Sequence, residues 1–192
     1  GVAWRAFGLE DAPRVAESLK GVKVVIHCAG PFSHTAKAMA EGCIRAGTHY
    51  LDISGEIEVF ESLARRDAEA KKAGVMLTPG AGFDVVPSDC LALHLRNRLP
   101  SATHLVLAFQ GLGGGFSRGT ATTMAENAHR GGAIRKDGAI TPVPAAWKTR
   151  PVDFGNGRPR TCVGIPWGDV YTAFHSTGIP NIEVYAAFPA GM

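Results

Sequence analysis

The stretch Val24-Val25-Ile26-His27-Cys28-Ala29-Gly30-Pro31-Phe32 joins an apolar run to a glycine turn. The stretch Gly74-Val75-Met76-Leu77-Thr78 ends in the same way, at Pro79-Gly80-Ala81-Gly82-Phe83-Asp84. Short apolar runs that open into glycine turns before a helix are typical of parallel strands whose carboxyl ends border a ligand crevice. The two stretches therefore predict an α/β fold built on a parallel sheet.

Further strands and helices alternate around these two stretches. We expect strands at 2–7, 23–29, 49–53 and 75–78. Helices are expected from Asp11, after Ser33 or Thr35, over 56–73 with Ser54 as its cap, and from Pro87 to Leu99. Alternation at these spacings predicts right-handed crossovers, and hence a partial Rossmann-like doubly wound parallel sheet.

The pattern changes after Pro100. We expect a strand over 103–110, a helix over 118–130, hairpin turns at 136–139 and 154–157, a helical segment at 169–175 and a final strand over 182–188. The sequence thus predicts two domains, a partial nucleotide-binding domain over 1–99 and an α+β domain over 100–192 that is incomplete at its carboxyl end. The glycine run 111–115 is not a phosphate loop, because Phe116 breaks the GxGxxG spacing.

Composition excludes several classes of protein. The chain has 192 residues, 45% of them hydrophobic, and a net charge of +3. Its basic residues are scattered, which argues against a nucleic-acid partner, and no apolar run is long enough to span a membrane. The four cysteines include no CxxC pair, so we expect reduced thiols, with Cys28 in a buried strand, no metal site and a cytoplasmic location.

The glycine turns supply the candidate contacts to a cofactor. Gly30 lets the backbone approach a ribose or diphosphate, although an ordinary tight turn would also explain it. Asp84 either orients a ligand or braces its loop, and His27 is expected to be a core residue. The residues predicted to bind the cofactor are Ala29, Gly30, Pro31, Phe32, Ser54, Gly82, Phe83 and Asp84. No catalytic residue is assigned.

Several blocks of the chain resemble the saccharopine dehydrogenase-like superfamily, and in particular its bacterial trans-acting enoyl reductase-like branch. The blocks are 27–32, 50–56, 80–89, 164–169 and 176–185. The resemblance implies a Rossmann domain that binds NAD or NADP, followed by an α+β substrate and dimerisation domain. It also implies a small-molecule substrate, lipid-like or derived from an amino acid, and a homodimer as the assembly.

The resemblance implies an NAD(P)-dependent oxidoreductase that reduces an enoyl or imine double bond. No glycine-rich strand–turn–helix unit precedes residue 22, so we expect this chain to be the central fragment of such an enzyme and inactive by itself. The alternative is a binding or dimerisation module that keeps the scaffold without redox activity.

Overall fold

The computed structural model of the chain describes residues 3–112, 122 and 131–187. These residues form two compact units, Gly1–Asp84 and Val85–Met192. The helix α5, Val86–Arg98, was expected in the first domain and lies in the second unit. The assignment of 1–99 and 100–192 to separate functions stays a prediction.

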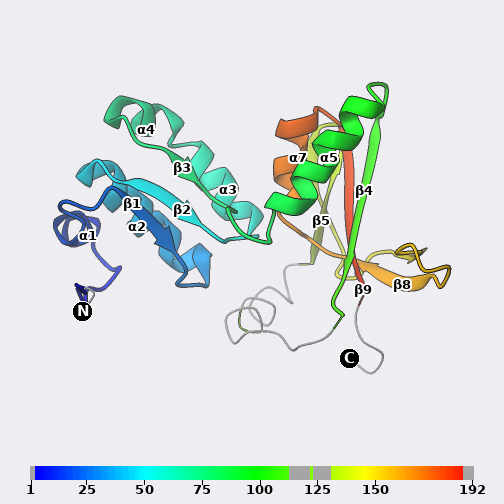
Figure 1. The fold of residues 1–192 in the computed structure, drawn as a ribbon, viewed down its shortest axis with the longest axis horizontal. Coiled ribbons are helices and arrows are strands. Elements are labelled where there is room, and N and C mark those ends of the chain that lie inside the picture. The colour runs from blue at the N-terminus through cyan, green and yellow to red at the C-terminus, as the bar shows by residue number, and fades with distance from the viewer. Residues whose placement is uncertain (1–2, 113–121, 123–130, 188–192) are drawn as a thin grey trace. The chain divides into compact units, whose positions relative to one another are not determined.

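The first unit contains a three-stranded parallel sheet in the order β1-β2-β3 (Figure 1). Its strands are β1 (Val24–His27), β2 (His49–Asp52) and β3 (Leu77–Thr78). The register pairs His27 with Asp52 and Leu51 with Thr78, so the three carboxyl ends meet at one edge of the sheet. The expected parallel α/β class is therefore confirmed.

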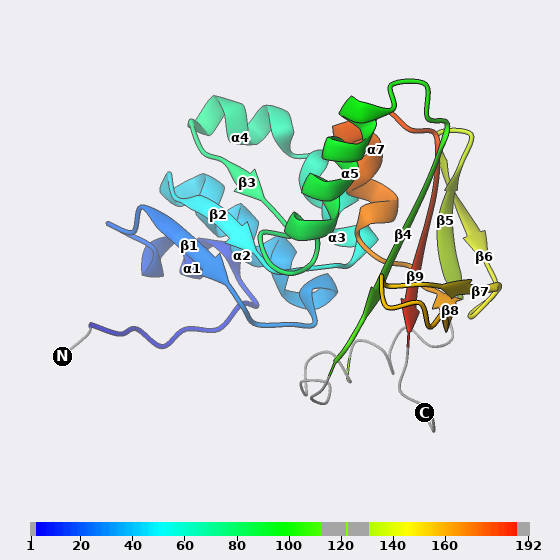
Figure 2. The same ribbon diagram turned by 45° about the vertical axis from the view of Figure 1, so that its right-hand side comes forward.

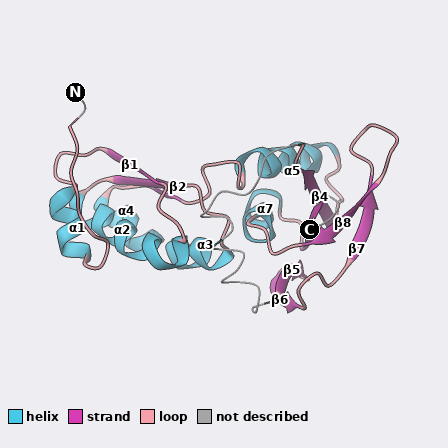
Figure 3. Cartoon of the chain, turned by 90° about the horizontal axis from the view of Figure 1, so that it is seen from below, coloured by secondary structure: helices cyan, strands magenta, loops and turns pink. Residues whose placement is uncertain are grey.

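The helices of the first unit gather on one face of β1 and β2, as seen from below in Figure 3. They are α1 (Ala12–Ser18), α2 (Phe32–Ala46), α3 (Ile57–Ala64) and α4 (Asp67–Ala73). One face of α2 is buried, with Met39 and Cys43 packed in a core that includes Tyr50. Burial raises the pKa of the Cys43 thiol to about 12. Removal of this apolar surface from water is the main force that holds the helices on the sheet.

Two expectations for the first unit are wrong. Residues 3–8 form no strand, and Trp4 is exposed; no described strand pairs with these residues. The helix expected over 56–73 is divided at Arg65 and Arg66 into α3 and α4. Arg66 leaves the helical conformation (φ −96°, ψ 7°) and serves as the N-cap residue of α4.

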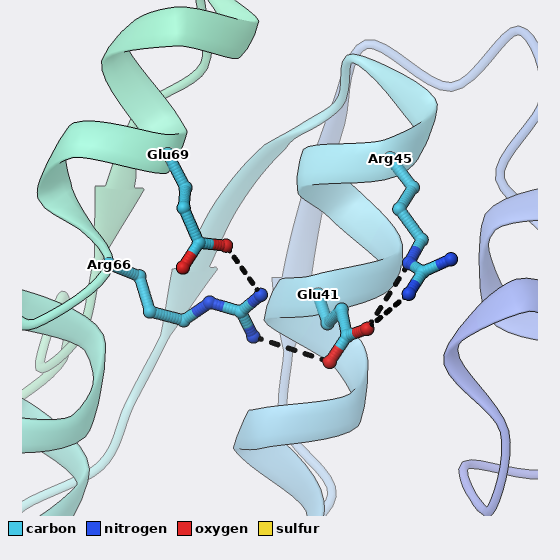
Figure 4. Close-up of polar contacts among 4 residues, drawn as sticks. All are labelled: Glu41, Arg45, Arg66 and Glu69. Carbon is cyan, nitrogen blue, oxygen red and sulfur yellow. Dashed lines mark hydrogen bonds and ion pairs between the residues drawn. The ribbon is translucent and has the colours of Figure 1, made fainter.

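An ion-pair network holds Arg66 at this break (Figure 4). Its guanidinium lies 2.8 Å from a carboxylate oxygen of Glu69 and 3.5 Å from one of Glu41. Glu41 also pairs with Arg45 at 2.6 Å on α2. The hydrogen bond from Arg45 is the largest of the effects that lower the pKa of Glu41. The network therefore ties the start of α4 to α2.

The second unit is a mixed sheet of six strands in which β9 is central (Figure 2). Strand β9 (Asn181–Ala187) pairs in parallel with β4 (His104–Gln110) and antiparallel with β5 (Gly132–Lys136) and β8 (Arg160–Gly164). The order β6-β5-β9-β8-β7 ends at β6 (Ala139–Val143) and β7 (Thr149–Val152), and β4 pairs with β9 alone among the described strands. The helices α5 and α7 (Asp169–Thr177) pack against each other beside this sheet.

Both hairpins expected in the second unit are confirmed. Asp137 and Gly138 have positive φ angles of 49° and 82°, the conformation of a two-residue turn between β5 and β6. Between β7 and β8, the Asp153 carboxylate accepts hydrogen bonds from three backbone N–H groups at residues 155–157. The helix expected over 118–130 lies outside the described residues.

Candidate functional site

The carboxyl edge of the β1-β2-β3 sheet brings the three predicted turns together within the first unit. The turns are 28–32 after β1, 53–56 after β2 and 79–84 after β3. This edge is where ligands bind in open parallel α/β sheets. We call these three turns the crevice edge.

Asp52 ties the second and third turns to each other. Its carboxylate is fully buried and accepts hydrogen bonds from the Tyr50 hydroxyl (2.6 Å), the Ser54 N–H (2.9 Å) and the Gly80 N–H (2.8 Å). The backbone carbonyl of Asp52 accepts a further bond of 2.7 Å from Ala81. Burial, followed by the charge of Asp52, raises the pKa of Tyr50 far above its usual range. Asp52 is therefore a structural brace that fixes two turns with one side chain.

Thr35 stabilises the first turn by hydrogen bonding. Its hydroxyl donates to the carbonyl of Ala29 at 2.6 Å and lies 2.9 Å from Nε2 of His27. His27 is buried, as expected of a core residue, and burial lowers its pKa against the opposing charge of Asp52. The Gly30–Pro31 peptide bond is cis. The exposed turn at Ala29 and Gly30 is thus connected through the half-buried Thr35 to the buried His27.

Glycines are required at close approaches within the crevice edge. Gly80 has φ +71°, and a Cβ there would lie 2.6 Å from the Phe60 ring. A Cβ on Gly82 would lie 3.0 Å from the Ile53 side chain, and one on Gly55 would lie 2.6 Å from Cγ of Asp84. Ordinary side chains at Gly80 and Gly82 would push the turns apart, and one at Gly55 would displace the Asp84 carboxylate.

The predicted cofactor residues occupy different environments on this edge. Ala29, Gly30 and Phe83 are exposed, and Pro31, Phe32, Gly82 and Asp84 are half-buried. Ser54 is fully buried, and its hydroxyl accepts the Glu56 N–H at 3.1 Å instead of capping a long helix. Direct contact is therefore open to the surface residues of this set, whereas Ser54 shapes its turn.

Sequence reasoning missed the role of Glu56. Its carboxylate accepts hydrogen bonds from the backbone N–H groups of Phe32 (2.9 Å) and Ser33 (2.8 Å), at the amino end of α2. The expected caps Ser33 and Thr35 do not serve α2, whose N-cap residue is Pro31. Glu56 thereby connects the first and second turns.

The thiols and possible metal ligands add no further site. All four cysteines are free; Cys43 and Cys162 are buried, whereas Cys90 and Cys28 are exposed, so the expected burial of Cys28 is wrong. Its side chain lies beyond the end of β1, where no element covers it. In the described ranges, no three His, Cys, Asp or Glu side chains gather as metal ligands. Among the same residues, no helix has the length and apolarity to cross a bilayer.

The second unit contains a buried polar contact between two blocks that are far apart in sequence. Ser88 Oγ on α5 donates to Oδ2 of Asp169 on α7 at 3.0 Å, and Ser176 Oγ lies 2.8 Å from both oxygens of Asp89. Asp169 is fully buried. These contacts join the two helices.

The first unit has the fold of a Rossmann-like domain, a parallel sheet whose turns gather at the carboxyl edge. Residues 4–78 match the family of the saccharopine dehydrogenase NADP binding domain. Over 94 residues, the chain is 32% identical to a saccharopine dehydrogenase-like oxidoreductase of Mus musculus, a match that covers 48% of this chain and 22% of that relative.

Two further relatives agree with this match. A protein of Mycobacterium tuberculosis, named as a candidate trans-acting enoyl reductase, is 32% identical over 110 residues, which cover 54% of this chain and 26% of that protein. The solved saccharopine dehydrogenase of Saccharomyces cerevisiae superposes with a TM-score of 0.66 at 17% identity, over 96% of this chain and 44% of that one. The chain thus spans about a quarter of the curated relatives' length over the matched regions.

These matches confirm the resemblance of the chain to the saccharopine dehydrogenase-like superfamily. The family is one of NADP-binding oxidoreductases, so the expectation of a nicotinamide cofactor is supported at that level.

Proposed function

We propose that this chain is part of an NADP-dependent oxidoreductase whose cofactor lies along the crevice edge of the first unit. The observation that carries this proposal is the convergence of three glycine turns at the carboxyl ends of parallel strands, within a segment that matches an NADP-binding domain. NADP is favoured over NAD because the matched family is described by that cofactor.

In this proposal, the exposed backbone at Ala29 and Gly30 approaches the cofactor, and the Phe83 ring offers it an apolar surface. Phe83 is 68% exposed. Pro31, Phe32, Gly82 and Asp84 complete the contact. Asp52 holds the turn that carries Gly82 and Asp84. The bound cofactor would supply hydride chemistry, for which the protein provides position and surroundings.

We further propose that the second unit belongs to a domain that covers the substrate. Reduction of an enoyl double bond is supported by the M. tuberculosis relative's name, and reduction of an imine by the saccharopine dehydrogenase likeness. The free thiols suit a reducing, cytoplasmic compartment. A non-catalytic module is the competing hypothesis, and cofactor binding separates the two.

The test is a fluorescence titration of NADPH and NADH with the wild-type chain and the variant Gly30→Ala. A Cβ at Gly30 meets only the Phe32 side chain, at 3.3 Å, so the fold should tolerate it. We expect it to weaken NADPH binding by about tenfold, because the methyl group stands between backbone and ligand.

Gly111→Ala is the matched control, since a Cβ there meets nothing within 4 Å. It should leave binding unchanged. Equal affinity of wild type and Gly30→Ala would remove this turn from the cofactor site, and the absence of NADPH and NADH binding to either would favour the non-catalytic module.

A further inference from the structure

Glu56 supplies a negative charge to the amino end of a helix that belongs to another part of the chain. Its two carboxylate oxygens accept the N–H groups of Phe32 and Ser33, the first two residues of α2. Such N–H groups have no partner inside their own helix and attract anions. No side chain at the N-cap position of α2 satisfies them. Glu56 therefore occupies the position at these N–H groups where a phosphate group would otherwise bind favourably.

The backbone of Glu56 is fixed before its side chain reaches α2. The Ser54 hydroxyl accepts the Glu56 N–H at 3.1 Å, and Asp52 accepts the Ser54 N–H at 2.9 Å. Asp84 packs closely against Gly55 on the other side of the turn. Because the turn is already ordered, the contact between Glu56 and α2 costs little additional conformational entropy.

We propose that Glu56 is a specificity-determining residue that keeps phosphate groups away from the carboxyl end of β1. A phosphate at the Phe32 and Ser33 amides would have to displace a carboxylate that is held in place, or bind beside its charge. Both options are unfavourable. The inference rests on the proposed function where it concerns the cofactor: the part that meets Gly30, Pro31 and Phe32 is uncharged, a ribose or the nicotinamide ring, and the phosphates lie elsewhere.

The test uses inorganic phosphate as the probe and the amide resonances of Phe32 and Ser33 as the readout. In Glu56→Ala the two N–H groups lose their partner, so we expect phosphate to shift these resonances in a saturable way, with affinity about tenfold above that of wild type. Glu58→Ala is the matched control, because it removes the same charge two residues further on. It should bind phosphate no better than wild type.

Glu56→Gln provides a second variant if the alanine variant does not fold. It keeps the side-chain length, removes the charge and should give a smaller gain of the same kind. Wild type that binds phosphate at these amides as well as Glu56→Ala does would overturn the inference. So would a folded Glu56→Ala or Glu56→Gln that gains no phosphate binding.

A parallel titration with NADPH distinguishes this inference from the proposed function. Phosphate binding gained by the variants, with no NADPH binding by any form, would leave the anion exclusion standing and reject the cofactor site. NADPH binding at the crevice edge without any gain in phosphate binding would support the cofactor site and reject the anion exclusion.

Discussion

Replacement of Asp169 by asparagine should change how the stability of the protein depends on pH. Its carboxyl group is fully buried at the start of α7. Ser88 donates one hydrogen bond to Oδ2, whereas Oδ1 has no hydrogen-bond partner among the described residues. Burial, assisted by the negative charge of Asp89 and opposed by the hydrogen bond from Ser88, raises the pKa of Asp169 from 3.8 to about 7.

The size of the effect follows from this raised pKa. In the unfolded chain the carboxyl group ionises near pH 3.8, but in the folded chain it stays protonated up to about pH 7. A difference of about three pKa units, at about 1.4 kcal/mol each, corresponds to about 4 kcal/mol. Below pH 3.8 both states are protonated and folding carries no penalty. The free energy of unfolding then falls as the pH rises towards 7, and this contribution is constant above it.

Asp169→Asn keeps the shape of the side chain and removes its ionisation. We expect the variant and the wild type to differ little at about pH 3.5, and the variant to be more stable by up to about 4 kcal/mol at about pH 8. Urea unfolding followed by tryptophan fluorescence measures this, since Trp167 lies two residues from the substitution. Asp89→Asn is a useful companion, because loss of its charge should reduce the pH dependence without abolishing it. A difference between Asp169→Asn and wild type that is the same at both pH values would refute the reasoning.

Three other substitutions test the packing of the two units. Gly42→Ala places a Cβ 2.7 Å from Cβ of Val15, so we expect a loss of about 1–3 kcal/mol in urea unfolding; a gain, as helix propensity alone predicts, would contradict this packing. Glu41→Gln removes the ion pairs with Arg45 and Arg66 and should lower the free energy of unfolding by about 0.5–1 kcal/mol. This effect should shrink in high salt. Because the pKa of Glu41 is lowered from 4.5, its stabilisation is present above that value and is lost as the pH falls below it; a loss that persists unchanged in acid would argue against the ion pairs. Gly138→Val, at φ +82°, should cost about 1–2 kcal/mol in thermal unfolding, and an unchanged melting temperature would exclude a required left-handed turn.

Features that depend on neighbouring residues were predictable from the sequence. The turn at Asp137-Gly138 is confirmed because its conformation is dictated by two residues. The parallel strands β1, β2 and β3 are confirmed because each is a short apolar run bounded by turn residues. The resemblance to the superfamily is confirmed by the match over residues 4–78.

Features that depend on distant partners were not predictable. Residues 2–7 have the composition of a strand, but a strand also needs a partner strand, and residues 3–8 pair with none of the described strands. The sequence over 56–73 favours a helix throughout, whereas Arg66, at the break, contacts Glu41 on another helix, a contact that no local pattern contains.

In the candidate site, too, local features were predictable from the sequence and contacts between distant residues were not. The glycine turns can be recognised from their strands. The hydrogen bonds that Glu56 accepts, however, come from residues 24 and 23 positions away, Phe32 and Ser33. An acid in the apolar strand 49–53 was the available signal for Asp52, but its bond with Gly80 spans 28 residues. Ser88 and Asp169 are separated by 81 residues, a contact that no local pattern contains.

The most direct test of the cofactor site is a titration of the isotope-labelled chain with NADPH, followed by amide chemical shifts, a measurement that also detects weak binding. The proposal predicts saturable shifts at Gly30, Phe32, Gly82 and Phe83, on the three turns of the crevice edge. Shifts confined to residues 85–187, or the absence of any shift, would contradict it.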